Sequence, residues 1–348
     1  SSKVATFGIY HYIKSRKQFK ITLSEMEGIQ EKFINMMYNT WIIQSSVNMT
    51  NDILDQGDSP SVISAIMKQQ TTERGRIVLN EGMDIHAGSA ICLGYGNFLE
   101  KFYKSIPIGI TVEGSNTLTR SLIIFAQGLN KSHPHIFPLL TSILNDDIEE
   151  FKYNFKNIVY HSLELYGTSL SPFNRYNNDL KQEIIRYATL TNFVALKGGL
   201  LKKEQMLSGD MADMFSNLYL ALSVQYHQDN NDTSKLFTEY VINRLISENQ
   251  VIMKRVISNL SLIERFALSH LVINPQPINY ENERKIFKEI MDNPNIIKEV
   301  KKDIYIKNTI LEDLELFTDS KERNIHNLNL YNKIISVGEF KIKIYFYL

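Results

Sequence analysis

Cysteine is nearly absent from this 348-residue sequence, and the single Cys92 excludes an internal disulfide and a cysteine-based zinc site. One thiol suits a reducing compartment, so we expect a cytoplasmic protein. Net charge is absent too, because 38 Lys and Arg residues balance 38 Asp and Glu residues, so we expect no nucleic-acid partner. No apolar stretch reaches the about 18 residues of a transmembrane segment, and no zinc, P-loop or Rossmann motif is present.

Residues that interrupt regular structure are also scarce, with 16 Gly and 8 Pro. Long segments instead carry apolar residues three and four positions apart, which is the spacing of an amphipathic helix. One such helix is predicted over Ser24–Asp55 with Gly57 as its stop, and a second long helix begins at Pro60. Residues 88–109 contain four glycines and predict a loop with one short helix near 98–102. Segments with strand periodicity are nearly absent, so the predicted fold class is all-α.

The chain divides at a change of composition near Pro134. Residues 1–131 hold four predicted helices and one glycine-bearing connection, which predicts a four-helix bundle. Further helical stretches predict a second helical domain over 132–317. Residues 318–348 are expected to be a poorly defined tail, in which GEFKIKIYFYL alternates apolar and basic residues. A short strand and an unpacked tail are both compatible with that pattern.

The most informative segment is Ile110–Gly128, ITVEGSNTLTRSLIIFAQG. A short strand-like approach leads to Glu113, Gly114 lets the backbone approach a ligand closely, and Ser115 suits the N-cap of a helix. Taken alone, this pattern also fits a solvated glutamate before a capped helix. The order Glu-Gly-Ser-x-x-Leu-x-Arg, which ends at Arg120, resembles the segment of acyl-CoA dehydrogenases that carries their catalytic base.

Two earlier segments resemble the same family in the same order. SRKQF resembles its Arg-x-x-Phe motif, and this implies that Arg16 reaches the pyrophosphate of an FAD bound mainly to a neighbouring subunit. The resemblance also implies that Phe19 packs against that cofactor. MDIHAGSA resembles the segment Gln-Ile-x-Gly-Gly-x-Gly that approaches the adenosine end of FAD. Asp84 stands at the position of the Gln and Gly88 matches a glycine, while Ala87 and a second alanine replace glycines.

The resemblance covers roughly residues 1–317, and Ala195–Tyr226 best matches the helical extension of the large bacterial members. The family places a helical domain and a β-domain before this region, and nothing in the sequence resembles either. The chain also opens at Ser1 inside an apparent amphipathic helix, without an initiator Met or a signal peptide. We therefore expect the C-terminal half of such an enzyme, inactive when isolated.

The resemblance implies FAD-dependent α,β-dehydrogenation of acyl-CoA thioesters to trans-2-enoyl-CoA, the first step of fatty-acid β-oxidation. Glu113 would be the base that removes the α-proton, and we expect it partly buried at the edge of its helix, facing a half-open cavity. The residues implied in cofactor binding are Arg16, Phe19, Asp84, Gly88 and Ser115. Implied partners are an acyl-CoA substrate, an electron-transfer acceptor and further copies in a homo-oligomer.

A second hypothesis belongs to a different class of protein. The chain would be a truncated or degenerate helical module that binds partners without catalysis. The two alanines at glycine positions and the unusual tail favour this alternative, whereas the intact motif at Glu113 favours the enzyme. Flavin absorbance of the purified full-length protein separates the two hypotheses.

Overall fold

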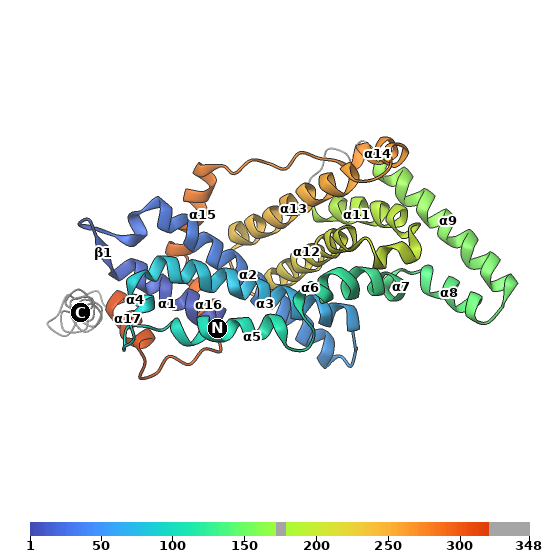
Figure 1. The fold of residues 1–348 in the computed structure, drawn as a ribbon. Helices are drawn as coiled ribbons and strands as arrows, with labels where there is room; N and C mark the ends of the chain where they lie inside the picture. The colour runs from blue at the N-terminus through green and yellow to red at the C-terminus, as the bar shows by residue number, and fades with distance from the viewer. Residues whose placement is uncertain (172–178, 320–348) are drawn as a thin grey trace.

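The computed structural model of the chain describes residues 1–171 and 179–319, and helices make up most of these residues (Figure 1). The one sheet among them is a hairpin of two short antiparallel strands, β1 (Lys17–Gln18) and β2 (Ile21–Thr22). The predicted all-α class is confirmed. The predicted tail, 318–348, lies almost entirely outside the described residues.

The N-terminal part is a bundle built on three long helices. Its elements are α1 (Ser2–Ser15), η1 (Leu23–Glu25), α2 (Glu27–Asp55), α3 (Ser61–His86), α4 (Gly88–Ile91), α5 (Glu100–Thr111), α6 (Asn116–Leu118), η2 (Thr119–Gln127) and α7 (Gly128–Ser132). Gly57 has a φ of 90° just beyond α2, a conformation that glycine adopts without steric cost, and this explains the predicted stop.

The C-terminal part continues as helices. Its elements are α8 (Ile136–Leu144), α9 (Ile148–Leu170), α11 (Leu180–Ala195), η3 (Gly198–Lys202), α12 (Gln205–Asn230), α13 (Lys235–Ser258), α14 (Leu262–Leu268), η4 (Ser269–Leu271), α15 (Tyr280–Asp292), α16 (Pro294–Lys301) and α17 (Ile310–Asp319). Figure 1 shows α8 and α9 projecting as a hairpin from one end of the molecule. The predicted boundary at 131/132 remains a prediction.

One hydrophobic core runs through both parts of the chain. α2 packs against α3 and α12, and α1 packs against α3 and α17. The buried side chains at these contacts include Phe33, Trp41 and Met214, none of which is exposed to solvent. Burial of side chains this large stabilises the fold by about 1.5–3 kcal/mol for each apolar residue.

A buried polar network also joins the two parts. The guanidinium of Arg74 on α3 donates through Nη1 to Asn39 Oδ1 on α2 at 2.9 Å. Its Nη2 donates to Asn217 Oδ1 on α12 at 3.1 Å. Arg74 is 7% exposed, and a buried guanidinium needs such partners to offset its lost hydration. The network therefore fixes how α2, α3 and α12 lie against one another.

Residues 88–109 were predicted to form a loop with one short helix near 98–102, and this underestimated their helix content. The structure places two helices there, α4 and α5, and α5 includes Pro107 and continues to Thr111. The strand-like approach expected at Ile110 is therefore the end of a helix. A proline removes one hydrogen bond inside a helix, and here the loss is tolerated because α5 has no buried residue and water can reach the freed carbonyl.

No helix in 1–171 or 179–319 is long and apolar enough to cross a membrane.

Candidate active site

Glu113 lies in the tight turn between α5 and α6. It has a φ of 56° and the following Gly114 has a φ of 93°, so two consecutive residues are left-handed. Ser115 then caps α6, because its Oγ accepts the N–H of Leu118 at 3.4 Å. The predicted N-cap is confirmed, and the turn places the Glu113 carboxylate just before the N-terminus of a helix.

Glu113 is exposed to solvent, so the expectation that it is partly buried was wrong. Its carboxylate forms no hydrogen bond or ion pair with any residue that the structure describes. Glu113 is exposed because no described element covers the turn after α5. Its neighbours Thr111, Val112 and Gly114 are exposed as well. The carboxylate is free to meet a ligand from outside the chain.

The backbone of the turn, in contrast, is firmly held by α3. Lys68 Nζ donates to the carbonyl oxygen of Gly114 and to Asn116 Oδ1, the latter at 2.7 Å. Asn116 Nδ2 donates to Thr72 Oγ1 at 2.9 Å and to Glu73 Oε1 at 2.8 Å. Sequence analysis did not identify Lys68, since nothing in the helical pattern of α3 distinguishes it from other lysines.

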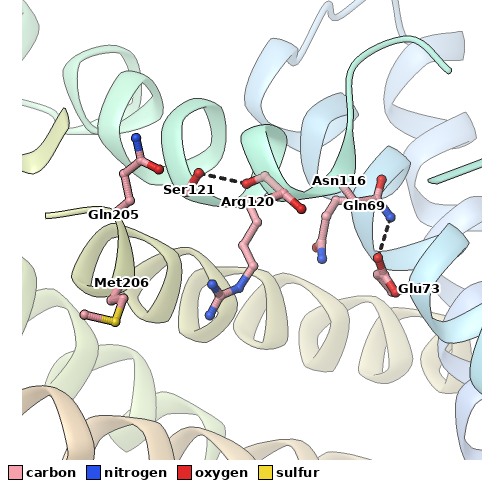
Figure 2. A pocket seen from close by; sticks show the side chains of 8 residues that line it. Gln69, Glu73, Asn116, Arg120, Ser121, Gln205 and Met206 are labelled. Carbon is pink, nitrogen blue, oxygen red and sulfur yellow. Dashed lines mark hydrogen bonds between the residues drawn. The ribbon is translucent and has the colours of Figure 1, made fainter. Parts of the chain in front are cut away.

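A cleft of about 380 Å³ lies beside this turn, between α3, the α6–η2 segment and the start of α12 (Figure 2). Its lining residues are mostly polar: Gln69, Glu73, Asn116, Thr117, Arg120, Ser121, Gln205 and Met206. Glu113 does not line this cleft, and the half-open cavity expected in front of its carboxylate remains a prediction.

The helix that follows the turn differs from the expected α-helix, because residues 119–127 form a π-helix, η2. Arg120, the last residue of the motif, extends from η2 to α12. Its Nε donates to both carboxylate oxygens of Asp213 at 2.9 Å, and its Nη2 donates to Asp210 Oδ1 at 3.1 Å. The hydrogen bonds that Arg120 donates to Asp213 raise the pKa of Arg120. Arg120 therefore fastens the motif to the C-terminal part of the chain.

The Arg-x-x-Phe segment forms the hairpin of β1 and β2. Phe19 and Lys20 occupy its tip with φ values of 51° and 73°, and the Phe19 side chain is 90% exposed. Positive φ at both central residues is the geometry of a type I′ turn, which usually contains Asn or Gly. Arg16 lies at the base of the hairpin and is half-buried. The hairpin thus presents an aromatic ring to solvent.

The segment MDIHAGSA contains the C-terminal end of α3, next to this hairpin. Asp84 is mostly exposed and accepts a hydrogen bond from Lys32 Nζ at 2.8 Å. A Cβ added at Gly88 would meet nothing within 4 Å, so the backbone there is open to a ligand. His86 is buried between the rings of Tyr12 and Phe98, at centroid distances of 4.5 and 4.7 Å.

Burial is the main cause that lowers the pKa of His86 to about 3, and the Arg16 guanidinium also contributes to this lowering. The hairpin follows α1, which packs against α3, and Figure 1 shows β1 and α4 at the same end of the bundle. The structure therefore gathers Arg16, Asp84 and Gly88 at one end of the bundle. It separates them from Glu113 and Ser115 by α5, whose twelve residues span about 18 Å. Figure 1 shows β1 and α4 at one end and α6 well removed from them.

Comparison with known proteins gives two family matches that cover most of the chain. Residues 6–127 match the model described as acyl-CoA dehydrogenase, C-terminal domain. Residues 130–338 match the model described as acyl-CoA dehydrogenase, C-terminal, bacterial type.

Two solved structures are similar in fold. An acyl-CoA dehydrogenase complexed with FAD from Bacillus anthracis matches with a TM-score of 0.63 and 21% sequence identity, over 84% of this chain and 53% of that one. An acyl-CoA oxidase-1 from Caenorhabditis elegans complexed with FAD and ATP matches with a TM-score of 0.48 and 10% identity, over 96% and 50% of the two chains. The chain spans about half the length of these proteins.

The fold and the matched regions define an all-helical protein of the acyl-CoA dehydrogenase C-terminal type. The chain belongs to the acyl-CoA dehydrogenase family.

Proposed function

We propose that this chain is the C-terminal part of a cytoplasmic FAD-dependent enzyme that oxidises acyl-CoA thioesters to trans-2-enoyl-CoA, the first step of fatty-acid β-oxidation. The observation that carries the proposal is the Glu113 turn. A carboxylate that has no hydrogen-bond or ion-pair partner in 1–171 or 179–319 projects from a backbone that is fixed by α3, which suits a base that acts on a substrate from outside the chain.

In this proposal Glu113 accepts the α-proton of the thioester. Removing a proton from carbon requires the carboxylate to be held at one position, and the anchored turn supports this. Desolvation by the substrate and by the rest of the enzyme would bring the proton affinity of the carboxylate closer to that of the substrate. Bound FAD would supply the acceptor for the β-hydrogen, which leaves as a hydride.

The proposed cofactor residues are Arg16, Phe19, Asp84, Gly88 and Ser115. Their properties fit the role: the Phe19 ring is exposed on its hairpin, and the backbone at Gly88 is open. A guanidinium such as that of Arg16 suits phosphate oxygens. Because the Phe19 ring points away from its own chain, we further propose a homo-oligomer in which the hairpin meets the cofactor of a neighbouring subunit. An electron-transfer partner would reoxidise the flavin.

The test is Glu113→Gln in the full-length protein with acyl-CoA as substrate. The amide keeps the shape of the side chain and removes the base, so turnover is expected to fall at least ~10²-fold. Flavin content and Tm, measured on the same preparations, should stay unchanged. An unaltered rate of acyl-CoA oxidation would show that the carboxylate has another role.

The alternative, a non-catalytic interaction module, is supported by a different observation. The α8–α9 hairpin exposes many large apolar side chains, including Phe137, Leu144, Ile148 and Leu163. Exposed apolar surface of this extent is typical of sites that bind other macromolecules. A full-length protein that is purified without flavin and that takes up none on titration would favour this alternative.

A further inference from the structure

The turn that carries Glu113 stores backbone strain. Glu113 is not a glycine, yet its φ is 56°. For an L-residue this conformation costs of order 1–3 kcal/mol and persists only where the surroundings enforce it. Gly114 continues in the left-handed region, so the turn relies on contacts from other elements.

Those contacts come from one face of α3. Lys68 and Thr72 lie one turn apart on that helix, Glu73 follows Thr72, and all three reach the segment after Glu113. Lys68 donates directly to the carbonyl oxygen of Gly114. A charged donor on a carbonyl forms a stronger hydrogen bond than a neutral one, and here it fixes the peptide that follows the strained pair.

Asn116 links the lysine to the rest of the helix. Its side chain is 6% exposed and uses both ends, with Oδ1 accepting from Lys68 and Nδ2 donating to Thr72 and Glu73. A buried amide with all these partners is a rigid connection, because breaking any one of them leaves a buried polar group unsatisfied. Lys68 and Asn116 thus form one clamp on the turn.

The Glu113 side chain has no such support, since its carboxylate contacts no described residue through a hydrogen bond or ion pair. Within the described part of the chain, its position therefore depends on the backbone alone. We propose that Lys68, acting through Gly114 and Asn116, is the positioning residue for Glu113. The proposal rests on the proposed function in so far as Glu113 is the base, but the clamp itself is a property of this chain.

The first experiment measures the clamp without catalysis. Hydrogen exchange is followed on wild-type protein and on Lys68→Met, which keeps the length of the side chain and removes its donors. Amides 113–118 are expected to exchange at least tenfold faster in Lys68→Met, with the rest of the bundle unchanged. Lys152→Met is the matched control, because Lys152 is exposed on α9, far along the chain from Glu113, and pairs with Glu149. It should alter no amide near Glu113.

The second experiment measures positioning in the full-length enzyme. Displacing the base lowers turnover, and a misplacement of about 1 Å can lower the rate by up to ~10²-fold. Lys68→Met is expected to lower kcat by at least about tenfold with KM for acyl-CoA within twofold. Lys68→Arg keeps a charged donor and should recover most of the rate. Asn116→Ala removes the link but leaves the Lys68–Gly114 contact, so an intermediate loss is expected.

Each outcome decides the proposal. Unchanged exchange at 113–118 in Lys68→Met would overturn it, as would faster exchange throughout the bundle, which would indicate a general structural role. A kcat within twofold of wild type would overturn it as well. If Glu113→Gln retains full activity, the proposed function fails, while the exchange experiment still tests the clamp. The two failures are therefore distinguishable.

Discussion

Arg120 on η2 and Asp213 on α12 form a two-pronged ion pair across 93 positions of sequence, with Nε at 2.9 Å from both carboxylate oxygens and Nη2 at 2.6 Å from Oδ2. The pair is partly exposed and receives further support from Asp210, which also binds Arg255. Gly209 lies against the guanidinium: a Cβ added there would be 2.2 Å from Arg120 Nη1. The absence of a side chain at 209 is therefore what lets Arg120 reach its partners.

Gly209→Ala is expected to lower the free energy of unfolding by about 1–3 kcal/mol, because the methyl group must displace a guanidinium that two aspartates hold. Gly167→Ala on α9 is the matched control. A Cβ there meets nothing within 4 Å, so alanine should raise the stability by up to about 1 kcal/mol through helix propensity. Urea unfolding of both variants checks the prediction, and changes of the same sign would contradict it.

Ala87 occupies a backbone conformation that suits glycine, with φ 53° and ψ −134° at the end of α3. Relief of this strain is worth about 1–3 kcal/mol, against roughly 0.5–1 kcal/mol for the greater freedom of glycine in the unfolded chain. Ala87→Gly should therefore raise the stability by about 1 kcal/mol. The control is Ala90→Gly, which removes a buried methyl group from α4 and should be destabilising. A lower Tm for Ala87→Gly than for wild type would refute the strain argument.

The uncharged ring of His133 accepts hydrogen bonds from the backbone at the start of α8. Its Nδ1 accepts the backbone N–H groups of His135 and Ile136 at 3.2 and 3.3 Å, and its Nε2 lies 3.0 Å from Asn192 Oδ1. Nδ1 can accept only while it carries no proton. Burial lowers the pKa of His133, and the nearby His161 and His135 lower it further, while Asn192 opposes them.

Because the folded-state pKa lies below the unfolded value of 6.5, His133 contributes stability above pH 6.5 that is lost as the pH falls through the folded value. We expect faster hydrogen exchange of amides 135 and 136 at pH 5 than at pH 7, after correction for the intrinsic rate. His133→Asn keeps an acceptor near the position of Nδ1 and does not titrate. An identical pH dependence in wild type and His133→Asn would rule out this histidine as the cause.

Residues 1–348 alone are expected to bind FAD weakly or not at all and to leave acyl-CoA unoxidised. The chain spans about half of the FAD-bound structure that it matches, and Phe19 on its hairpin is 90% exposed. A flavin held from one side stays in water, where hydrogen bonds and charges contribute little to binding. Titration of the purified chain with FAD, followed by fluorescence, checks this. Stoichiometric tight binding, with bleaching of the flavin on addition of acyl-CoA, would disprove it.

Local sequence determined the features that depend on residues a few positions apart. Apolar spacing predicted α2 and α3, Gly57 predicted the end of α2, and Ser115 predicted the cap of α6. These predictions succeed because a helix is stabilised by hydrogen bonds and side-chain contacts within about four residues. The order of the motifs around Glu113 identified the family in the same way, since each motif is a short run of chain.

Only the tertiary structure decided what surrounds those motifs. The exposure of Glu113, the clamp by Lys68 across 46 positions and the pairing of Arg120 with Asp213 follow from how distant helices pack. The same cause extends α5 through Pro107, because the exposed position of that helix lets water satisfy its freed carbonyl. Periodicity specifies which face of a helix is apolar, whereas burial and the partners of each side chain depend on which other helix covers that face.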